Sequence, residues 1–220
     1  TSMVQYSFKE DGRNLAIVLL LASLIFGFRL GAFGLLDPDE PFYSLTAKEM
    51  IQNHDLWTPV IFGQPQFEKP IFFYWVLCLS YKLFGISEFA SRLGSLAAGL
   101  ATVGLTYLWG VVLFKRRSIA FVSAVILAPA AEFVVVSRIV LTDVTLCFFI
   151  TAALFFFSLG YENQNIRKKA WFFVFVFCGL GFLTKGPIGV LFPWMGILAF
   201  LSFNKQTNFL KQFPWFFGLA

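Results

Sequence analysis

Long apolar runs separated by short charged loops constrain the fold of this chain more than any other feature. The runs at residues 15–36 and 90–114 are each long enough to cross, as a helix, a hydrocarbon core of about 30 Å. Hydrophobic residues make up 58% of the chain and charged residues only 13%, which is far from the average soluble domain. Because a charge at the centre of a bilayer costs about 3 kcal/mol, this pattern predicts an all-α fold: a polytopic transmembrane helix bundle.

The positions of the basic residues indicate which of these apolar runs cross the membrane. The net charge of +5 comes from short clusters between apolar runs, without the aromatic-flanked basic stripe of a nucleic-acid site, so we expect no nucleic-acid partner. Short cytoplasmic loops collect Lys and Arg, and every basic cluster falls on the side of the N-terminus if residues 70–85 lie along the membrane surface. The spans predicted on this basis are 15–36, 90–114, 118–136, 143–160, 170–184 and 187–203, with a further span starting at 213–220.

A polar segment at residues 37–70, from DPDEP to FEKP, interrupts the apolar sequence. It holds six of the twelve acidic residues and the single histidine. Pro41 suits the first turn of a helix that runs to about Asn53. Residues 70–85 are short for a span, are interrupted by Lys82 and are rich in aromatic side chains, which is typical of an interfacial helix. We therefore expect residues 37–89 to form an outer loop with interfacial helices.

Asp39 and Glu40 are adjacent carboxylates at the start of the first loop helix. One interpretation is structural, with Asp39 as the N-cap and Glu40 as a residue favoured by the helix dipole. Neighbours on a helix point about 100° apart, so these two do not form a facing acid/base pair. Either one could still act alone as a base or a metal ligand.

Three further positions fall on the same outer side under this topology. Lys69 follows Glu68, and the two form either an interfacial ion pair or a site where Lys69 holds a phosphate. Asp143 begins an apolar run, either as a helix cap or as a functional carboxylate. Lys185 stands at a Gly-Pro break. Lysines can hold a lipid-linked phosphate, and a carboxylate can take a proton or bind a divalent cation, which indicates group transfer from a phospholipid-type donor.

Several motifs resemble those of one enzyme family. DPDEPFYSLTAKEM, then Asp55-Leu-Trp-Thr-Pro and Phe67-Glu-Lys-Pro-Ile, resemble in order and spacing the first outer loop of the bacterial GT-C glycosyltransferases. Ser137-Arg138 to Thr142-Asp143 resembles their second-loop acidic motif, and Leu183-Thr-Lys-Gly-Pro-Ile their later lysine motif. Within this superfamily the chain is most similar to the aminoarabinose transferases of lipid A and the related dolichyl-phosphate-mannose protein mannosyltransferases.

The resemblance implies a fold, a reaction and a location. It implies a GT-C bundle of which residues 1–220 are the N-terminal part, and an active site facing the periplasm from the bacterial inner membrane, among membrane lipids. A sugar would move, with inversion, from a polyprenyl-phosphate donor to a lipid A-like glycolipid or a protein. A divalent metal (Mg²⁺, Mn²⁺ or Zn²⁺) is the one cofactor it leaves open. The implied roles are catalytic for Asp39, Glu40 and Asp143, substrate-binding for Lys69, Lys185 and Tyr43, and metal-binding for Glu68.

Two other functions fit the same charges. A lipid-phosphate transporter or flippase would move the lipid without breaking a bond, and it predicts polar residues along the spans, where few are found beyond Arg29. A non-catalytic membrane subunit is the other alternative, and it predicts no binding of polyprenyl phosphate.

Overall fold

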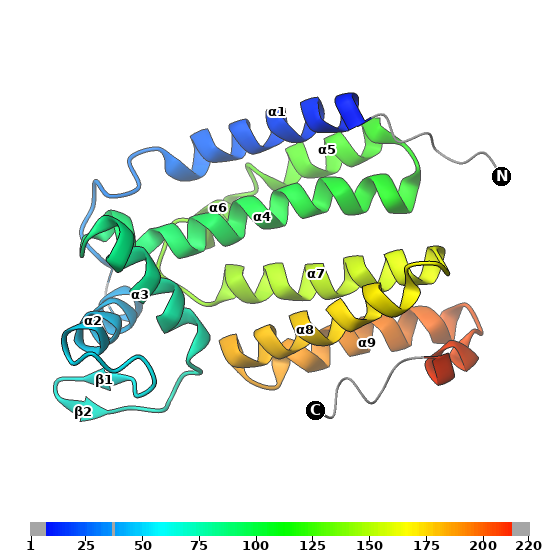
Figure 1. Ribbon diagram of the computed structural model, residues 1–220. Coiled ribbons are helices and arrows are strands. Elements are labelled where there is room, and N and C mark those ends of the chain that lie inside the picture. Colours follow the sequence, from blue (N-terminus) through cyan, green and yellow to red (C-terminus); the bar gives the residue numbers. More distant parts are fainter. Residues whose placement is uncertain (1–7, 37, 213–220) are drawn as a thin grey trace.

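The computed structural model describes residues 8–36 and 38–212 (Figure 1). Nearly all regular structure in this part of the chain is helical, apart from one hairpin in which β1 (Val60–Ile61) pairs antiparallel with β2 (Gln64–Pro65). The helices are α1 (Phe8–Gly27), α2 (Asp39–Gln52), α3 (Phe72–Phe84), α4 (Glu88–Phe114), α5 (Arg117–Leu127), α6 (Ala131–Val136), α7 (Asp143–Glu162), α8 (Arg167–Lys185), α9 (Ile188–Phe203) and the 3-10 turn η1 (Thr207–Gln212).

The helices form a bundle with a cap at one end. In Figure 1, α1, α4, α5, α7, α8 and α9 run lengthwise, whereas α2, α3 and the hairpin gather at one end. We call residues 39–84 the loop cap. At this end α1 and α8 finish and α4 and α7 begin, while the α4–α5 and α7–α8 connections lie at the opposite end. The basic clusters at 115–117 and 167–169 therefore lie opposite the polar loop, in the arrangement that the sequence predicts.

Two of the described helices have the length and composition of a membrane span. Among the described helices, α4 and α7 are long and apolar enough to cross a membrane, and α3, α5 and α9 are apolar but shorter. The predicted surface helix at 70–85 is a helix, α3, of 13 residues. At 1.5 Å per residue it extends about 20 Å, too short for a core of about 30 Å.

Two predicted spans differ from the observed helices. The first, 15–36, is replaced by α1 at Phe8–Gly27, and the chain then turns, with Leu30 N donating to Gly27 O at 3.2 Å. The run predicted at 118–136 is divided into α5 and α6 around Pro129. A proline lacks the N–H that continues a helix and disfavours helical backbone just before it, so α5 ends at Leu127. The span start predicted at 213–220 lies outside the described residues.

The loop cap has its own core. Tyr43 and Met50 from α2 pack with Phe73, Tyr74 and Leu77 from α3, and all five side chains are buried. The aromatic rings of Tyr43 and Phe73 meet edge to face at 5.4 Å. Because the apolar faces of α2 and α3 pack against each other, these two helices are held together as one body.

Close contact between α8 and α9 depends on glycine. A Cβ added at Gly189 would collide with the backbone of Gly181, whereas one added at Gly179, also on α8, would meet nothing within 4 Å. Helices α8 and α9 can therefore approach this closely only because neither Gly181 nor Gly189 has a side chain.

This contact predicts opposite results for two alanine substitutions. Gly189→Ala in the full-length protein is expected to destabilise by about 1–3 kcal/mol, since the helices must separate. Gly179→Ala is the matched control and should be neutral or stabilising, because alanine favours helix by about 1 kcal/mol over glycine. Thermal unfolding in detergent measures both, and equal melting temperatures for the two variants would contradict the packing.

Candidate active site

A buried ion pair, Glu40–Arg92, lies at the junction of the cap and the bundle. Arg92 Nη2 lies 2.8 Å from Glu40 Oε2, and both side chains are at most 5% exposed. Arg92 Nε donates to Glu40 Oε1 at 2.9 Å. The remaining guanidinium hydrogens go to the carbonyl oxygens of Leu30, Phe33 and Gly34 at 2.8–2.9 Å. All five donors of the guanidinium are thus used.

Glu40 binds backbone as well. Its Oε2 accepts from Leu36 N at 2.7 Å and its Oε1 from Val140 N at 2.8 Å. Burial by itself would raise the pKa of the Glu40 carboxyl, but the hydrogen bonds from Arg92, Leu36 and Val140 outweigh it and lower the pKa, so this group stays ionised. The carboxylate therefore joins the turn after α1, helix α2, helix α4 and the segment before α7.

This geometry distinguishes Glu40 from Asp39, the two adjacent carboxylates for which the resemblance implies catalytic roles. Glu40 is 2% exposed and committed to four hydrogen-bonding groups, so the structure gives it a positioning role. Asp39, one residue earlier, is exposed. Sequence reasoning missed Arg92; the available signal was a lone arginine inside the apolar run 90–114, because such a charge must find a partner.

Asp143 and Lys185 are brought together from distant parts of the chain. Lys185 Nζ at the end of α8 donates to Asp143 Oδ1 at the start of α7, at 2.7 Å. The lysine and aspartate side chains are 39% and 48% exposed. Exposed ion pairs contribute little net stability, so a stronger anionic ligand can take the lysine from the aspartate.

The charges of Asp39 and Asp143 both act on the buried hydroxyl of Tyr43. Burial raises the pKa of the Tyr43 hydroxyl, a hydrogen bond with Thr142 acts in the opposite direction, and the negative charges of Asp39 and Asp143 raise the pKa further. Both carboxylates are therefore near enough to act electrostatically on one buried phenol. The Tyr43 hydroxyl stays neutral and can serve as a hydrogen-bond donor.

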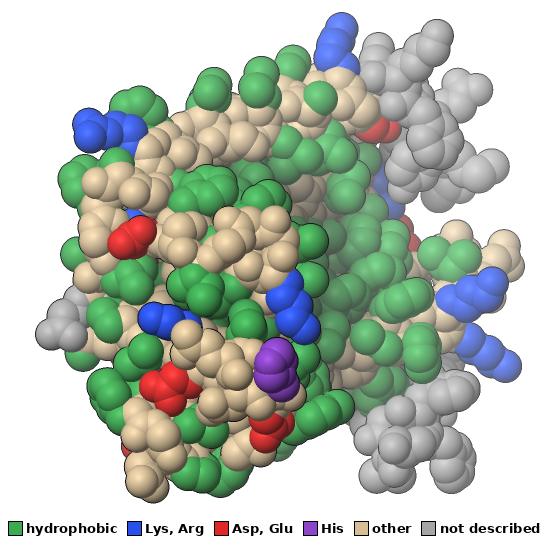
Figure 2. Space-filling view, turned by 60° about the vertical axis from the view of Figure 1, so that its left-hand side comes forward, with side chains coloured by type: hydrophobic (Ala, Val, Ile, Leu, Met, Phe, Trp, Pro, Cys, Tyr) green, Lys and Arg blue, Asp and Glu red, His purple; other side chains and the backbone are tan. Residues whose placement is uncertain are grey.

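A second tyrosine extends the site toward Glu68. The rings of Tyr43 and Tyr74 lie 5.8 Å apart, and Gln66 Nε2 donates to the Tyr74 hydroxyl at 2.6 Å. Burial, with a smaller contribution from the charge of Glu68, raises the pKa of Tyr74 to about 12. Glu68 and Lys69 are exposed in the loop between β2 and α3. Charged groups of both signs and the histidine gather on this end of the molecule (Figure 2).

The metal prediction for Glu68 finds no further support within the described ranges. Nowhere in residues 8–36 and 38–212 do three His, Cys, Asp or Glu side chains come together as a potential metal site. Glu68 alone does not build such a site.

The sequence matches one family over most of its length. The family is described as dolichyl-phosphate-mannose-protein mannosyltransferase, and the match covers residues 14–215. An uncharacterized protein of Aquifex aeolicus is 30% identical, over 90% of this chain and 40% of its own length. The undecaprenyl phosphate-alpha-4-amino-4-deoxy-L-arabinose arabinosyl transferase of Yersinia enterocolitica is 28% identical, over 92% of this chain and 37% of its own length. The chain thus spans about two fifths of these relatives.

Solved structures share the fold. ArnT from Cupriavidus metallidurans bound to undecaprenyl phosphate has a TM-score of 0.83 and 23% identity, covering 97% of this chain and 39% of ArnT. The same protein in the apo state gives a TM-score of 0.82 at 24% identity, covering 94% of this chain and 38% of ArnT. This likeness confirms the predicted all-α helix-bundle fold.

Removing the arginine of the buried ion pair should lower the free energy of unfolding far more than breaking an exposed ion pair. Arg92→Leu leaves the Glu40 carboxylate buried without a cation, which costs about 3–5 kcal/mol. Lys115→Leu is the matched control, since its pair with Glu162 is 47% and 45% exposed and should cost at most about 1 kcal/mol. Thermal unfolding of the full-length variants measures both, and similar losses would contradict the assigned role of Arg92.

The pKa of Glu40 also predicts a pH dependence of stability. Its folded pKa lies below the unfolded value of about 4.3. The stabilisation is therefore complete above the unfolded value and is lost as the pH falls through the folded pKa. Melting temperatures between neutral pH and pH 3 should fall more steeply for the wild type than for Glu40→Gln. Parallel curves would show that this carboxylate does not contribute.

Proposed function

The chain belongs to the dolichyl-phosphate-mannose-protein mannosyltransferase family, and from this premise we propose that it forms part of a membrane glycosyltransferase that uses a polyprenyl-phosphate sugar donor. Two comparisons support the donor class. The name of the Yersinia enterocolitica relative contains undecaprenyl phosphate-alpha-4-amino-4-deoxy-L-arabinose, and ArnT was solved bound to undecaprenyl phosphate. The acceptor would be a lipid A-like glycolipid or a protein.

The single observation that carries the proposal is the exposed Asp143–Lys185 ion pair, whose aspartate acts, together with Asp39, on the charge environment of the Tyr43 hydroxyl. A lysine ammonium suits a phosphate as a compact point charge. When the donor arrives, Lys185 exchanges the Asp143 carboxylate for the phosphate, and Lys69 serves as a second cation. Asp143 thus keeps Lys185 oriented while the site is empty of donor.

The transfer step then needs a base and a stabilised leaving group. Asp39 takes the proton of the acceptor hydroxyl as the hydroxyl oxygen attacks the anomeric carbon. The bond between that carbon and the phosphate oxygen breaks, and its electron pair leaves with the polyprenyl phosphate. Lys185 and Lys69 stabilise the added negative charge on the phosphate. Glu40, held by Arg92, fixes the start of α2 and so sets the position of Asp39.

The charge of the loops supports a location for the loop cap. Basic loops favour the cytoplasmic side, and here they lie opposite the loop cap (Figure 1). We therefore place the loop cap, with Asp39 and Lys69, at the periplasmic face of a bacterial inner membrane. Long apolar chains gain about 0.8 kcal/mol per buried CH₂, so the lipid part of the donor remains in the bilayer while its phosphate meets the lysines.

The role of Asp39 predicts loss of turnover with the fold kept. Asp39→Asn in the full-length protein should lower sugar transfer about 10²- to 10⁴-fold, the usual contribution of a general base, with an unchanged melting temperature. Glu132→Gln is the matched control, because Glu132 is an exposed carboxylate of α6 outside the proposed site. Transfer of labelled sugar from polyprenyl phosphate is measured, and near-normal turnover in Asp39→Asn would refute the assignment.

A further inference from the structure

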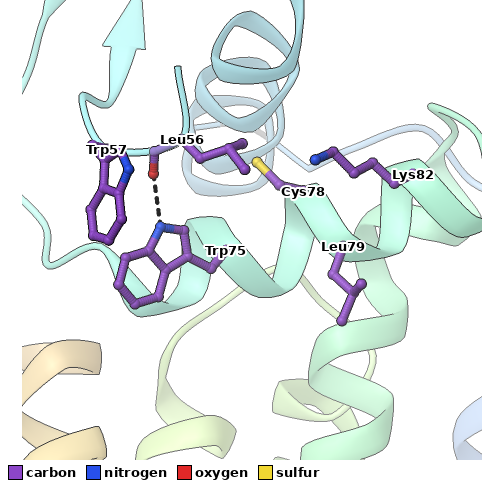
Figure 3. Close-up of a pocket in the computed structure, with 6 residues that line it drawn as sticks. All are labelled: Leu56, Trp57, Trp75, Cys78, Leu79 and Lys82. Atoms are coloured by element: carbon purple, nitrogen blue, oxygen red, sulfur yellow. Dashed lines mark hydrogen bonds between the residues drawn. The ribbon is translucent and has the colours of Figure 1, made fainter. Parts of the chain in front are cut away.

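An apolar pocket of about 420 Å³ lies on the loop cap, apart from the proposed site. Its walls come from α3 and from the loop that follows α2 (Figure 3). Trp75 Nε1 donates to Leu56 O at 2.8 Å, and the rings of Trp57 and Trp75 meet edge to face at 5.5 Å. These contacts fix one end of the pocket. The lining residues are Leu56, Trp57, Trp75, Cys78, Leu79 and Lys82.

Lys82 is the only charged residue of this lining, and it lies at the end away from the two indole rings (Figure 3). It is exposed, and within the described part of the chain its side-chain ammonium forms no ion pair or hydrogen bond. It nevertheless lies close enough to Cys78 that its charge acts on the thiol. An ammonium that lacks a counter-charge and lies beside an apolar wall can bind one phosphate group.

The apolar wall continues onto the outer face of α3. Trp75, Leu79, Lys82 and Leu83 follow the spacing of three and four residues that places side chains on one helix face. Leu79 and Leu83 are 59% and 66% exposed, and Trp57 across the pocket is 77% exposed. Exposed apolar area of this kind marks a contact with lipid or a partner, and an amphipathic helix with tryptophan and lysine is suited to the membrane interface.

This face differs from the face that serves the proposed site. Tyr74 is fully buried and turns toward Tyr43, whereas Trp75, the next residue, points about 100° away. The pocket therefore has its own cation, Lys82, and neither Lys69 nor Lys185 is among its lining residues.

We propose that this pocket binds an anionic phospholipid of the surrounding membrane. Lys82 holds the headgroup phosphate, and the upper part of an acyl chain packs on Trp57, Trp75 and Leu79. Such a lipid would hold the loop cap against the bilayer surface. The proposal rests on the location of the cap at a membrane and not on the transferase reaction.

The two pocket tryptophans provide the test. The full-length protein is placed in nanodiscs that contain phosphatidylcholine with a small fraction of brominated phosphatidylglycerol or brominated phosphatidylcholine, and quenching of tryptophan fluorescence is measured. A variant with Trp57→Phe and Trp75→Phe gives the background from the remaining tryptophans. The quenching specific to the pocket should show about a fivefold preference for phosphatidylglycerol, the contribution of one lysine near an anionic headgroup.

Two charge variants complete the design. Lys82→Gln should abolish the preference, and Lys169→Gln, an exposed lysine at the opposite end of the bundle, should keep it. Equal quenching by both lipids in the wild type, or a preference that persists in Lys82→Gln, would overturn the proposal. Release of brominated phosphatidylglycerol by an equimolar amount of polyprenyl phosphate would also overturn it, because the pocket would then belong to the donor.

Discussion

The buried pairing of Glu40 with Arg92 is the interaction on which the rest of the structure depends. Each ion removed from water needs a partner and further hydrogen bonds to offset its loss of hydration. Arg92 donates hydrogen bonds to three carbonyl oxygens of the turn after α1, and Glu40 accepts hydrogen bonds from two backbone N–H groups. Four separate pieces of chain are thereby held at one point, where the loop cap meets the bundle.

The position of the proposed catalytic groups follows from this junction. Glu40 faces inward on α2, so its neighbour Asp39 faces solvent, and the bond from Val140 N to Glu40 fixes the segment that leads into α7 and Asp143. Lys185 reaches the same place because α8 ends beside the start of α7. Rigid elements therefore carry each charged group, while the charged groups themselves stay exposed and able to exchange partners.

The charge distribution along the bundle supports two roles for its lysines. Lys185 already has a carboxylate partner that a donor phosphate could replace, whereas Lys82 on α3 has an apolar pocket beside it and no described counter-charge. The first arrangement suits a reaction that binds and releases its ligand. The second suits a lipid that remains bound, since it leaves a cation to be neutralised by the membrane itself.

The sequence by itself determined the all-α membrane fold, the family and the grouping of Asp39, Lys69, Asp143 and Lys185 at one end, because hydrophobic run length, loop charge and local motifs are written along the chain. It also indicated α3 as a helix too short to span. Only the tertiary structure decided that Glu40 is buried and fully hydrogen-bonded whereas Asp39 is exposed, since two partners of Glu40, Arg92 and Val140, lie 52 and 100 residues away in sequence. It also decided that α1 stops at Gly27, because the carbonyl oxygens freed beyond it are satisfied by Arg92 and Arg138 from other parts of the chain.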